Sequence, residues 1–259
     1  MGDDELLSTL RAAADAVRAA LDGLPDWGLA GTRAGQYRSD LAADDACLAV
    51  LDAAGLGWLS EESGVAHGDR EVVVIVDPVD GSTNASRGIP WFATSLCAVD
   101  GDGPLAAVVV NQATGRRYEA VRGGGATVDG APLHPSGETS LANAIVGMSG
   151  YPNHYLGWKQ FRALGAAALD LCAVAEGVLD GYLDCSPSAH GSWDYAGGLL
   201  VCAEAGVPVV DAFGRDLITL DHDGRRTPIA GATVALTDEL VAARRTLQWP
   251  DDPPIPGGV

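Results

Sequence analysis

Cationic residues are scarce in this sequence. It carries 16 lysines and arginines against 35 aspartates and glutamates, Lys159 is the only lysine, and the formal net charge is −19. An electrostatic field of this sign repels the phosphates of nucleic acids and of anionic membrane surfaces. We therefore expect neither a nucleic acid nor a membrane among the partners of the protein.

Paired cysteines and long apolar runs are missing as well. The five cysteines are dispersed, and none has the spacing of a zinc site: Cys47, Cys97, Cys172, Cys185 and Cys202. An odd, scattered set of this kind is typical of reduced thiols in a cytoplasm. No signal peptide opens the sequence, and no apolar run reaches the length of a membrane-spanning helix. These absences predict a cytoplasmic protein.

What the sequence does contain is a pair of acids at the end of an apolar run. Residues 72–76 are apolar and mostly β-branched, which predicts a strand buried on both faces. Asp77 and Asp80 follow, and because Pro78 between them cannot donate to a strand ladder, we expect the chain to turn there. Residues 81–83 (Gly-Ser-Thr) suit a helix N-terminus, whose free N–H groups favour a phosphate. Alone, these acids would equally suit an ordinary turn.

Further acids stand where predicted helices begin or predicted strands end. Glu61 and Glu62 follow a short strand and repel each other unless a cation lies between them. Asp44 and Asp194 each lie near the start of a predicted helix, where a carboxylate can also simply favour the helix dipole. Magnesium prefers hard oxygen ligands, and two such ions can activate a water and stabilise a leaving oxygen. The acids together predict metal-assisted hydrolysis of a phosphate ester.

Apolar periodicity outlines the secondary structure, and a second unit of the chain begins near residue 140. Predicted helices cover residues 3–24, a segment from about residue 41, and residues 166–177, 193–204 and 237–247. Predicted strands cover residues 57–59, 72–76, 92–99, 105–111, 118–121, 126–128, 144–148, 182–183, 207–210 and 229–235. The glycines at 123–125 join two short strands, which predicts a turn and not a nucleotide-binding loop.

Three segments resemble the signature motifs of the inositol monophosphatase family. They are Leu-Ser-Glu-Glu-Ser at residues 59–63, Asp-Pro-Val-Asp-Gly-Ser-Thr-Asn at residues 77–84 and Trp-Asp-Tyr-Ala-Gly at residues 193–197, in the family's order. The resemblance implies a layered αβαβα fold and a homodimer. It also implies an N-terminal α+β half over residues 1–139, a C-terminal α/β half over residues 140–250 with the site between the halves, and a flexible tail over residues 251–259.

The same resemblance assigns a role to each matching acid. It implies that Glu61, Asp77 and the carbonyl of Val79 hold one magnesium ion, and that Asp77, Asp80 and Asp194 hold a second. Glu61 matches the residue that reaches a third, weaker ion, so the resemblance implies two to three ions per site.

The resemblance implies the substrate-facing residues too. Asp44 and Ser82 match the pair that orients the attacking water, with Asp45 as the alternative to Asp44. The backbone N–H groups of Gly81 and Ser82 would hold the phosphate, and Asp80 and Asp194 would also border the substrate. The remaining two residues implied are Asp184, which would contact substrate hydroxyls, and Ala167, which would lie near the sugar.

These motifs predict a magnesium-dependent phosphatase for a small phosphomonoester, inositol monophosphate first. The alternatives are histidinol phosphate, fructose 1,6-bisphosphate, a nucleotide 3′-phosphate, or a weakly active homologue that serves as a regulatory binding protein. A bisphosphate needs a second cationic site, and residues 166–168 and 182–193 contain no lysine or arginine. We therefore expect a monophosphate of a polyol or an amino alcohol to be preferred. His190, in the second of these segments, is interpreted as a solvent-exposed loop residue.

Overall fold

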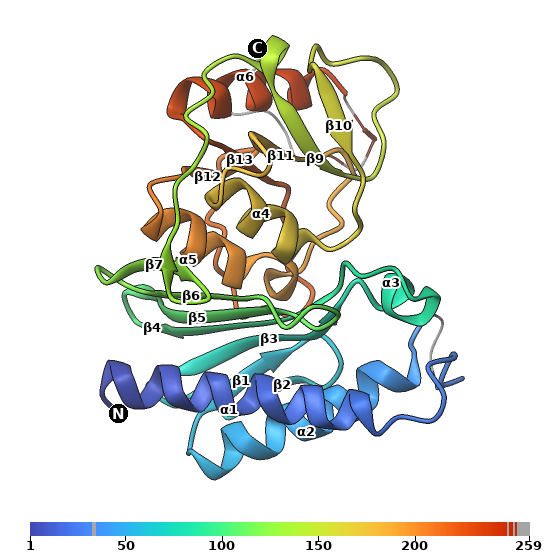
Figure 1. Cartoon of the computed structure of the whole chain (residues 1–259), viewed down its shortest axis with the longest axis vertical. Coiled ribbons are helices and arrows are strands. Elements are labelled where there is room, and N and C mark those ends of the chain that lie inside the picture. Colours follow the sequence, from blue (N-terminus) through green and yellow to red (C-terminus); the bar gives the residue numbers. More distant parts are fainter. Residues whose placement is uncertain (33–34, 248, 251, 253–259) are drawn as a thin grey trace.

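Helices and sheets alternate in five layers in the computed structural model of the chain, which describes residues 1–32, 35–247, 249–250 and 252 (Figure 1). Helices α1 (Asp3–Asp22) and α2 (Arg38–Ala53) cover one face of an eight-stranded sheet. Helices α4 (Ala167–Ala175) and α5 (Ala196–Glu204) lie between that sheet and a five-stranded sheet, and α6 (Val234–Arg245) covers the far face of the second sheet. The αβαβα layering is confirmed.

The eight-stranded sheet has the strand order β2-β1-β3-β4-β5-β6-β7-β8. Its strands are β1 (Gly57–Ser60), β2 (Gly64–Ala66), β3 (Val73–Asp80), β4 (Ala93–Asp100), β5 (Gly103–Asn111), β6 (Arg117–Val121), β7 (Gly125–Val128) and β8 (Ala131–Pro132). β1 pairs in parallel with β3, and the other neighbouring strands pair antiparallel. The predicted turn at the triple glycine is confirmed, and Gly123 and Gly125 donate their backbone N–H groups to Glu204 of α5.

Strand β3 runs through the core and carries two of the predicted site acids. Alternate residues from Val73 to Val76 pack toward α4 and α5 on one face and toward α1 and α2 on the other, so the strand is buried on both faces as predicted. The prediction that the chain turns at Pro78 is wrong, because β3 continues to Asp80. Its register against β4 shifts between Asp77 and Asp80, and this bulge accommodates a residue that cannot donate to the ladder.

The five-stranded sheet has the order β10-β9-β11-β13-β12. Its strands are β9 (Ile145–Ser149), β10 (Gln160–Arg162), β11 (Gly181–Asp184), β12 (Val209–Asp211) and β13 (Pro228–Gly231). The strand predicted over residues 229–235 is shorter, because Thr233 accepts a hydrogen bond from the backbone of Leu236 and caps the start of α6. Residue 140, where we expect the second unit to begin, lies between β8 and β9, beside the short 3₁₀ helix η1 (Leu141–Asn143).

Helix α5 approaches its neighbours closely because it begins with adjacent glycines. A Cβ atom at Gly197 would lie 2.6 Å from the hydroxyl of Ser95, and one at Gly198 would lie 2.7 Å from Cβ of Leu171. Side chains do not tolerate such distances, so only glycine fits at both positions. As a result the 3₁₀ helix η2 (Ser192–Asp194), just before α5, contacts strands β3 and β4 of the first sheet.

The end of the chain folds back onto the end of β11. The guanidinium of Arg244 donates to the carbonyl of Asp184 at 2.8 Å and to that of Ser186 at 3.0 Å. The indole of Trp249 donates to the carbonyl of Cys185 at 2.8 Å. Arg244 is fully buried and forms an ion pair with Asp252 at 2.7 Å. The flexible tail predicted over residues 251–259 lies outside the described residues, apart from Asp252.

A membrane-crossing helix is not present in the part of the chain that the structure describes. Each helix there is either too short or too polar for that role.

Candidate metal and active site

Three carboxylates from separate parts of the chain meet between the two sheets. Glu61 follows β1, Asp77 lies in the β3 bulge and Asp194 ends η2. Each offers an oxygen atom, and these three atoms lie within 4.8 Å of one another. The close approach of α5 to the first sheet brings Asp194 to the other two. The structure therefore gathers acids that the sequence places in three different motifs.

A fourth acid, Asp80, lies at the same place. It is buried, and one of its carboxylate oxygens accepts the backbone N–H of Ala168, in the first turn of α4, at 2.8 Å. Burial raises the pKa of Asp80, and the charge of Asp194 raises it further. Asp80 therefore belongs to the same electrostatic cluster as the three acids above.

Each of these acids makes its neighbours harder to ionise. Burial raises the pKa of Glu61 well above its ordinary value, and the charges of Asp194 and Glu62 raise it further. Burial is likewise the main cause of the raised pKa of Asp77, followed by the charges of Glu61 and Asp80. Like charges at such distances are unfavourable unless a cation lies between them.

The donor set fits magnesium. It consists of carboxylate oxygens, and the resemblance adds the carbonyl oxygen of Val79, which here accepts the hydroxyl of Ser82 at 2.9 Å. Hard oxygen donors around a concentrated negative charge suit this ion, and no sulfur or nitrogen ligand belongs to the three-acid group. We therefore treat the cluster as a candidate magnesium site.

The turn after β3 requires a glycine. Gly81 has φ +86°, and a Cβ atom there would lie 3.0 Å from the carbonyl oxygen of Gly165 and 3.1 Å from that of Trp91. Ser82 then opens the short helix α3 (Ser82–Arg87). Only glycine satisfies both the positive φ and the close approach of these two carbonyl groups.

Asp44 lies on the buried side of α2. Its carboxylate accepts the hydroxyl of Ser60 at 2.5 Å and that of Ser63. Asp45, the alternative considered from the sequence, is exposed. Asp44 thus contacts the serines on either side of Glu61 and Glu62.

A residue that sequence reasoning missed lies one turn earlier on the same helix. Asp40 is buried, and its carboxylate accepts the backbone N–H of Tyr37 at 2.9 Å. Its charge raises the pKa of both Glu61 and Asp77. The available signal was its spacing of four residues from Asp44, which places the two acids on one face of a helix.

The two remaining residues implied by the resemblance come from the second half of the sequence, and both are buried. Ala167 begins α4, and Asp184 ends β11 with no exposed surface. One oxygen of Asp184 accepts the backbone N–H of Ser186 at 2.8 Å, and burial raises the pKa of this carboxyl.

The interpretation of His190 as a solvent-exposed loop residue is wrong. Its side chain is 14% exposed and lies between two acids, with Nδ1 3.1 Å from Asp194 and Nε2 3.8 Å from Asp184. Burial on its own lowers the pKa of His190, but the two carboxylates outweigh burial and raise it to about 9. The sequence does not show that this loop folds inward, because the attraction comes from acids that precede and follow it.

A second missed group comes from the long connection between β12 and β13. The ring of His222 lies 4.8 Å from that of Trp193, and its Nε2 atom lies 3.2 Å from the carbonyl oxygen of Glu61. The guanidinium of Arg225 lies 5.2 Å from the same indole. No motif marks these residues, since only the fold brings residues 212–227 beside the cluster. Arg225 thereby places a positive charge beside Trp193, the residue that precedes Asp194.

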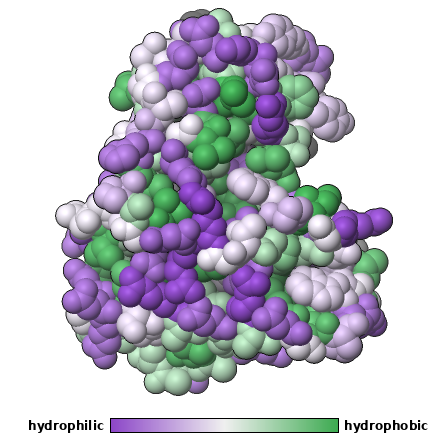
Figure 2. Space-filling view, viewed as in Figure 1, coloured by the Kyte–Doolittle hydropathy of each residue, from purple (hydrophilic) through white to green (hydrophobic). Residues whose placement is uncertain are grey.

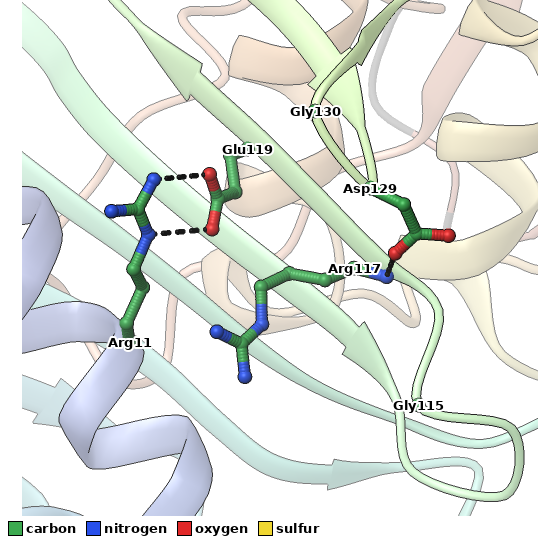
Figure 3. Close-up of a pocket in the computed structure, with 6 residues that line it drawn as sticks. All are labelled: Arg11, Gly115, Arg117, Glu119, Asp129 and Gly130. Atoms are coloured by element: carbon green, nitrogen blue, oxygen red, sulfur yellow. Dashed lines mark hydrogen bonds and ion pairs between the residues drawn. The ribbon is translucent and has the colours of Figure 1, made fainter.

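A separate surface pocket of about 380 Å³ lies between α1 and strands β6 and β7 (Figure 3). Figure 2 shows hydrophilic side chains gathered on this face, where α1 crosses the sheet. Both guanidinium groups that line the pocket are already paired, Arg11 with Glu119 through two hydrogen bonds and Arg117 with Asp15. The pocket contains no group of converging carboxylates, so the cluster described above is the better candidate for chemistry.

Comparison with known proteins gives a consistent result. The model of the inositol monophosphatase family matches residues 40–248. A fructose-1,6-bisphosphatase of Pyrococcus furiosus is 35% identical over 69% of this chain and 70% of its own length. An inositol-1-monophosphatase of Mesorhizobium japonicum is 37% identical over 68% of this chain and 72% of its own.

Solved structures show the same fold. An inositol monophosphatase from Anabaena superposes with a TM-score of 0.79 at 24% identity, over 95% of this chain and 97% of that one. The extragenic suppressor protein suhB from Bartonella henselae superposes with the same TM-score at 29% identity, over 93% of this chain and 98% of its own.

Proposed function

The chain belongs to the inositol monophosphatase family, and from this premise we propose that it hydrolyses the monophosphate of a small polyol or amino alcohol, inositol monophosphate first, with magnesium. The observation that carries the proposal is the meeting of Glu61, Asp77 and Asp194, with Asp80 beside them. A bound cation would let these carboxyls ionise together, and such a cation is what metal-assisted phosphate hydrolysis uses.

Each residue of the cluster has a role in this proposal. Glu61, Asp77, Asp80, Asp194 and the carbonyl of Val79 would hold two to three magnesium ions. Magnesium, when bound, supplies positive charge to the phosphoryl oxygens and makes a water easier to deprotonate.

The turn after β3 would bind the phosphate and handle the water. The backbone N–H groups of Gly81 and Ser82 would donate to phosphate oxygens, and the Ser82 hydroxyl with an acid of α2 would orient the attacking water and accept its proton. The resemblance assigns that acid to Asp44. We favour Asp40 instead, because its charge reaches Glu61 and Asp77, whereas the carboxylate of Asp44 already binds two hydroxyl groups.

Substitutions in α2 are expected to separate the two acids. Ser82→Ala should lower kcat by about 10²- to 10⁴-fold and change KM little, since general-base positioning has that magnitude. We expect Asp40→Asn to lower kcat in the same way, and Asp44→Asn mainly to lower the melting temperature, because its carboxylate binds Ser60 and Ser63. Exposed Asp45→Asn is the control, with neither effect. A larger loss of kcat in Asp44→Asn than in Asp40→Asn would restore the assignment to Asp44.

A bisphosphate is the second candidate substrate, and one observation favours it. Arg225 stacks on Trp193, next to Asp194, and could pair with a distal phosphate. Relatives named fructose-1,6-bisphosphatase are also among the similar proteins. Against it, the buried segments around Ala167 and Asp184 carry no lysine or arginine. We keep the monophosphate as the proposed substrate.

Catalytic efficiencies decide between these substrates. We expect kcat/KM for inositol 1-phosphate to exceed that for fructose 1,6-bisphosphate and for adenosine 3′,5′-bisphosphate. A bisphosphate that wins by tenfold, or about 1.4 kcal/mol, would refute the preference. In that case Arg225→Ala should reduce the efficiency for the bisphosphate and leave that for inositol 1-phosphate unchanged.

We also propose a homodimer in a cytoplasm. Support comes from the exposed aromatic side chains of Tyr151, Tyr155 and Phe161, the last of them on β10, which is an edge strand of the second sheet. An open strand edge beside exposed aromatic rings is a common site of association. Light scattering of the purified protein measures its mass, and a monomer at all concentrations would contradict the dimer.

A further inference from the structure

We propose that the loop of residues 217–226, between β12 and β13, holds Glu61 and Asp194 at the separation that a shared metal ion needs, with His222 as the positioning residue. Glu61 follows a strand of the first sheet, whereas Asp194 lies between two strands of the second sheet in the sequence. The separation of the two acids therefore depends on contacts between the two sheets' surroundings. The inference rests on the proposed function, because it concerns ligands of the same metal site.

Both ends of this loop are fixed to the segment that carries Asp194. At the first end, the hydroxyl of Tyr195 donates to the carbonyl of Leu217 at 2.5 Å. At the other end, the backbone N–H of Arg226 donates to the carbonyl of His190 at 2.8 Å. These contacts lie on either side of η2, so the loop and η2 are held together.

The tip of the loop places His222 against η2. Its imidazole lies 4.8 Å from the indole of Trp193, with an angle of 32° between the two planes. The tip is a tight turn, in which the backbone N–H of Gly224 donates to the carbonyl of Asp221 at 3.0 Å. A Cβ atom at Gly224 would lie only 3.0 Å from that carbonyl oxygen, so a larger residue would disturb the turn. The position of the imidazole is therefore set by the turn and by the indole together.

From this position His222 reaches the first sheet. Its Nε2 atom lies 3.2 Å from the carbonyl oxygen of Glu61, and since a carbonyl only accepts, Nε2 carries the hydrogen. The contact has this direction whether the imidazole is neutral or protonated. The backbone N–H of Glu61 donates in turn to the carbonyl of Val76 in β3 at 3.1 Å. Both polar backbone groups of Glu61 are thus held, one by the first sheet and one by the loop.

This restraint acts on two acids that would otherwise move apart. The carboxylate oxygens of Glu61 and Asp194 lie within 4.8 Å of each other, and like charges at this distance repel. His222 opposes the separation, because it contacts the backbone of one acid and stacks on the residue that precedes the other. Groups that orient metal ligands without binding the metal are worth about 10- to 100-fold in metal affinity. The loop is therefore expected to strengthen magnesium binding.

Two substitutions of His222 separate the hydrogen bond from the stacking. His222→Phe keeps a ring against Trp193 but has no donor, and His222→Gln offers an amide N–H near the place of Nε2 but has no ring. Magnesium binding is measured by titration calorimetry. We expect His222→Phe to weaken it about 10- to 100-fold, and His222→Gln to bind magnesium more tightly than His222→Phe.

Kinetics provides a second readout. In His222→Phe the magnesium concentration that gives half the maximal rate should rise by about the same factor, 10- to 100-fold. The rate at saturating magnesium should fall far less than the rate at low magnesium, because the loop positions ligands of the ion. An unchanged magnesium affinity in His222→Phe would overturn the proposal even if the melting temperature fell, since packing alone would then explain the contact.

His67→Ala is a matched control. The ring of His67 also packs against a tryptophan, at 5.5 Å from that of Trp58. Glu61 lies in the turn between β1 and β2, whereas His67 follows the far end of β2. Its loss should leave magnesium affinity unchanged. An equal weakening of magnesium binding in this control would assign the effect to general destabilisation and would overturn the proposal.

The proposed function and the role of the loop can fail separately. If the unmodified protein bound magnesium but hydrolysed no phosphate ester, the proposed function would fail, and the titrations of the His222 variants would still decide on the loop. If the protein hydrolysed phosphate esters and His222→Phe bound magnesium normally, only the role of the loop would be refuted.

Discussion

Replacing Asp77 by asparagine is expected to abolish most activity and, at the same time, to stabilise the metal-free protein. Asp77 lies between Glu61 and Asp80 and would bind both magnesium ions, so its loss should reduce kcat by more than the 10- to 100-fold typical of an outer-shell partner. The gain in stability follows from the raised pKa of Asp77, which shows that the folded state opposes its ionisation.

Both effects can be measured on one preparation. Turnover at saturating magnesium gives the first, and thermal unfolding in the presence of a chelator gives the second. Asp102→Asn, at the exposed turn between β4 and β5, is the control and should change neither quantity. Near-normal turnover in Asp77→Asn would contradict the two-metal site.

The metal-free protein is expected to lose stability as the pH rises. Burial raises the pKa of Glu61, Asp77 and Asp80 well above the ordinary values of these side chains. Carboxyls of this kind contribute stability that is fully present below the unfolded pKa and is lost as the pH rises through the folded pKa. His190 acts in the same direction, because its pKa is raised from 6.5 to about 9.

Magnesium should reverse this trend. At a concentration of 100 times its dissociation constant, a ligand that binds only the folded state adds about 2.7 kcal/mol of stability. Because the ion binds ionised carboxylates, the gain should be larger near pH 8 than near pH 5. The measurement is the melting temperature against pH with chelator and with magnesium. A chelated protein whose melting temperature is flat between about pH 5 and pH 8 would show that the cluster carries no such strain.

Sequence motifs located the acids of the cluster because those acids lie next to a strand end or a helix start. Asp77 and Asp80 follow an apolar run, and Asp194 precedes a glycine-rich helix start, so local patterns identify both places. These segments meet because α5 packs closely through Gly197 and Gly198. The importance of the two glycines can be recognised only once the fold is known.

Two of the residues that were missed, His190 and His222, have no local signal, and Asp40 has only its spacing of four residues from Asp44. His190 lies in a loop with an irregular sequence, and its contacts are with acids four and six residues away whose directions depend on η2 and β11. His222 reaches Glu61 across a separation of 161 residues. Asp40 resembles any acid in the first turn of a helix. In each case tertiary contacts and not the local pattern define the role.

The bulge in β3 illustrates the opposite error. Pro78 correctly indicates that the ladder is interrupted, but an interruption is not an end. The hydroxyl of Thr94 donates to the carbonyl of Pro78 at 2.9 Å and keeps the strand beside β4 through the irregular step. After the shift in register, Asp77 and Asp80 lie close enough for the charge of Asp80 to raise the pKa of Asp77.

The contacts that residues 244 and 249 make with the carbonyl groups of residues 184–186 have a practical and an evolutionary consequence. Arg244 and Trp249 hold the end of β11, where Asp184 lies, so these two residues support the site although they lie far from it in the sequence. An affinity tag is therefore better fused to the N-terminus, at α1. Because Arg244 and Trp249 lie outside the three motifs, substitutions of these residues would change the support of the strand end while every motif stays intact.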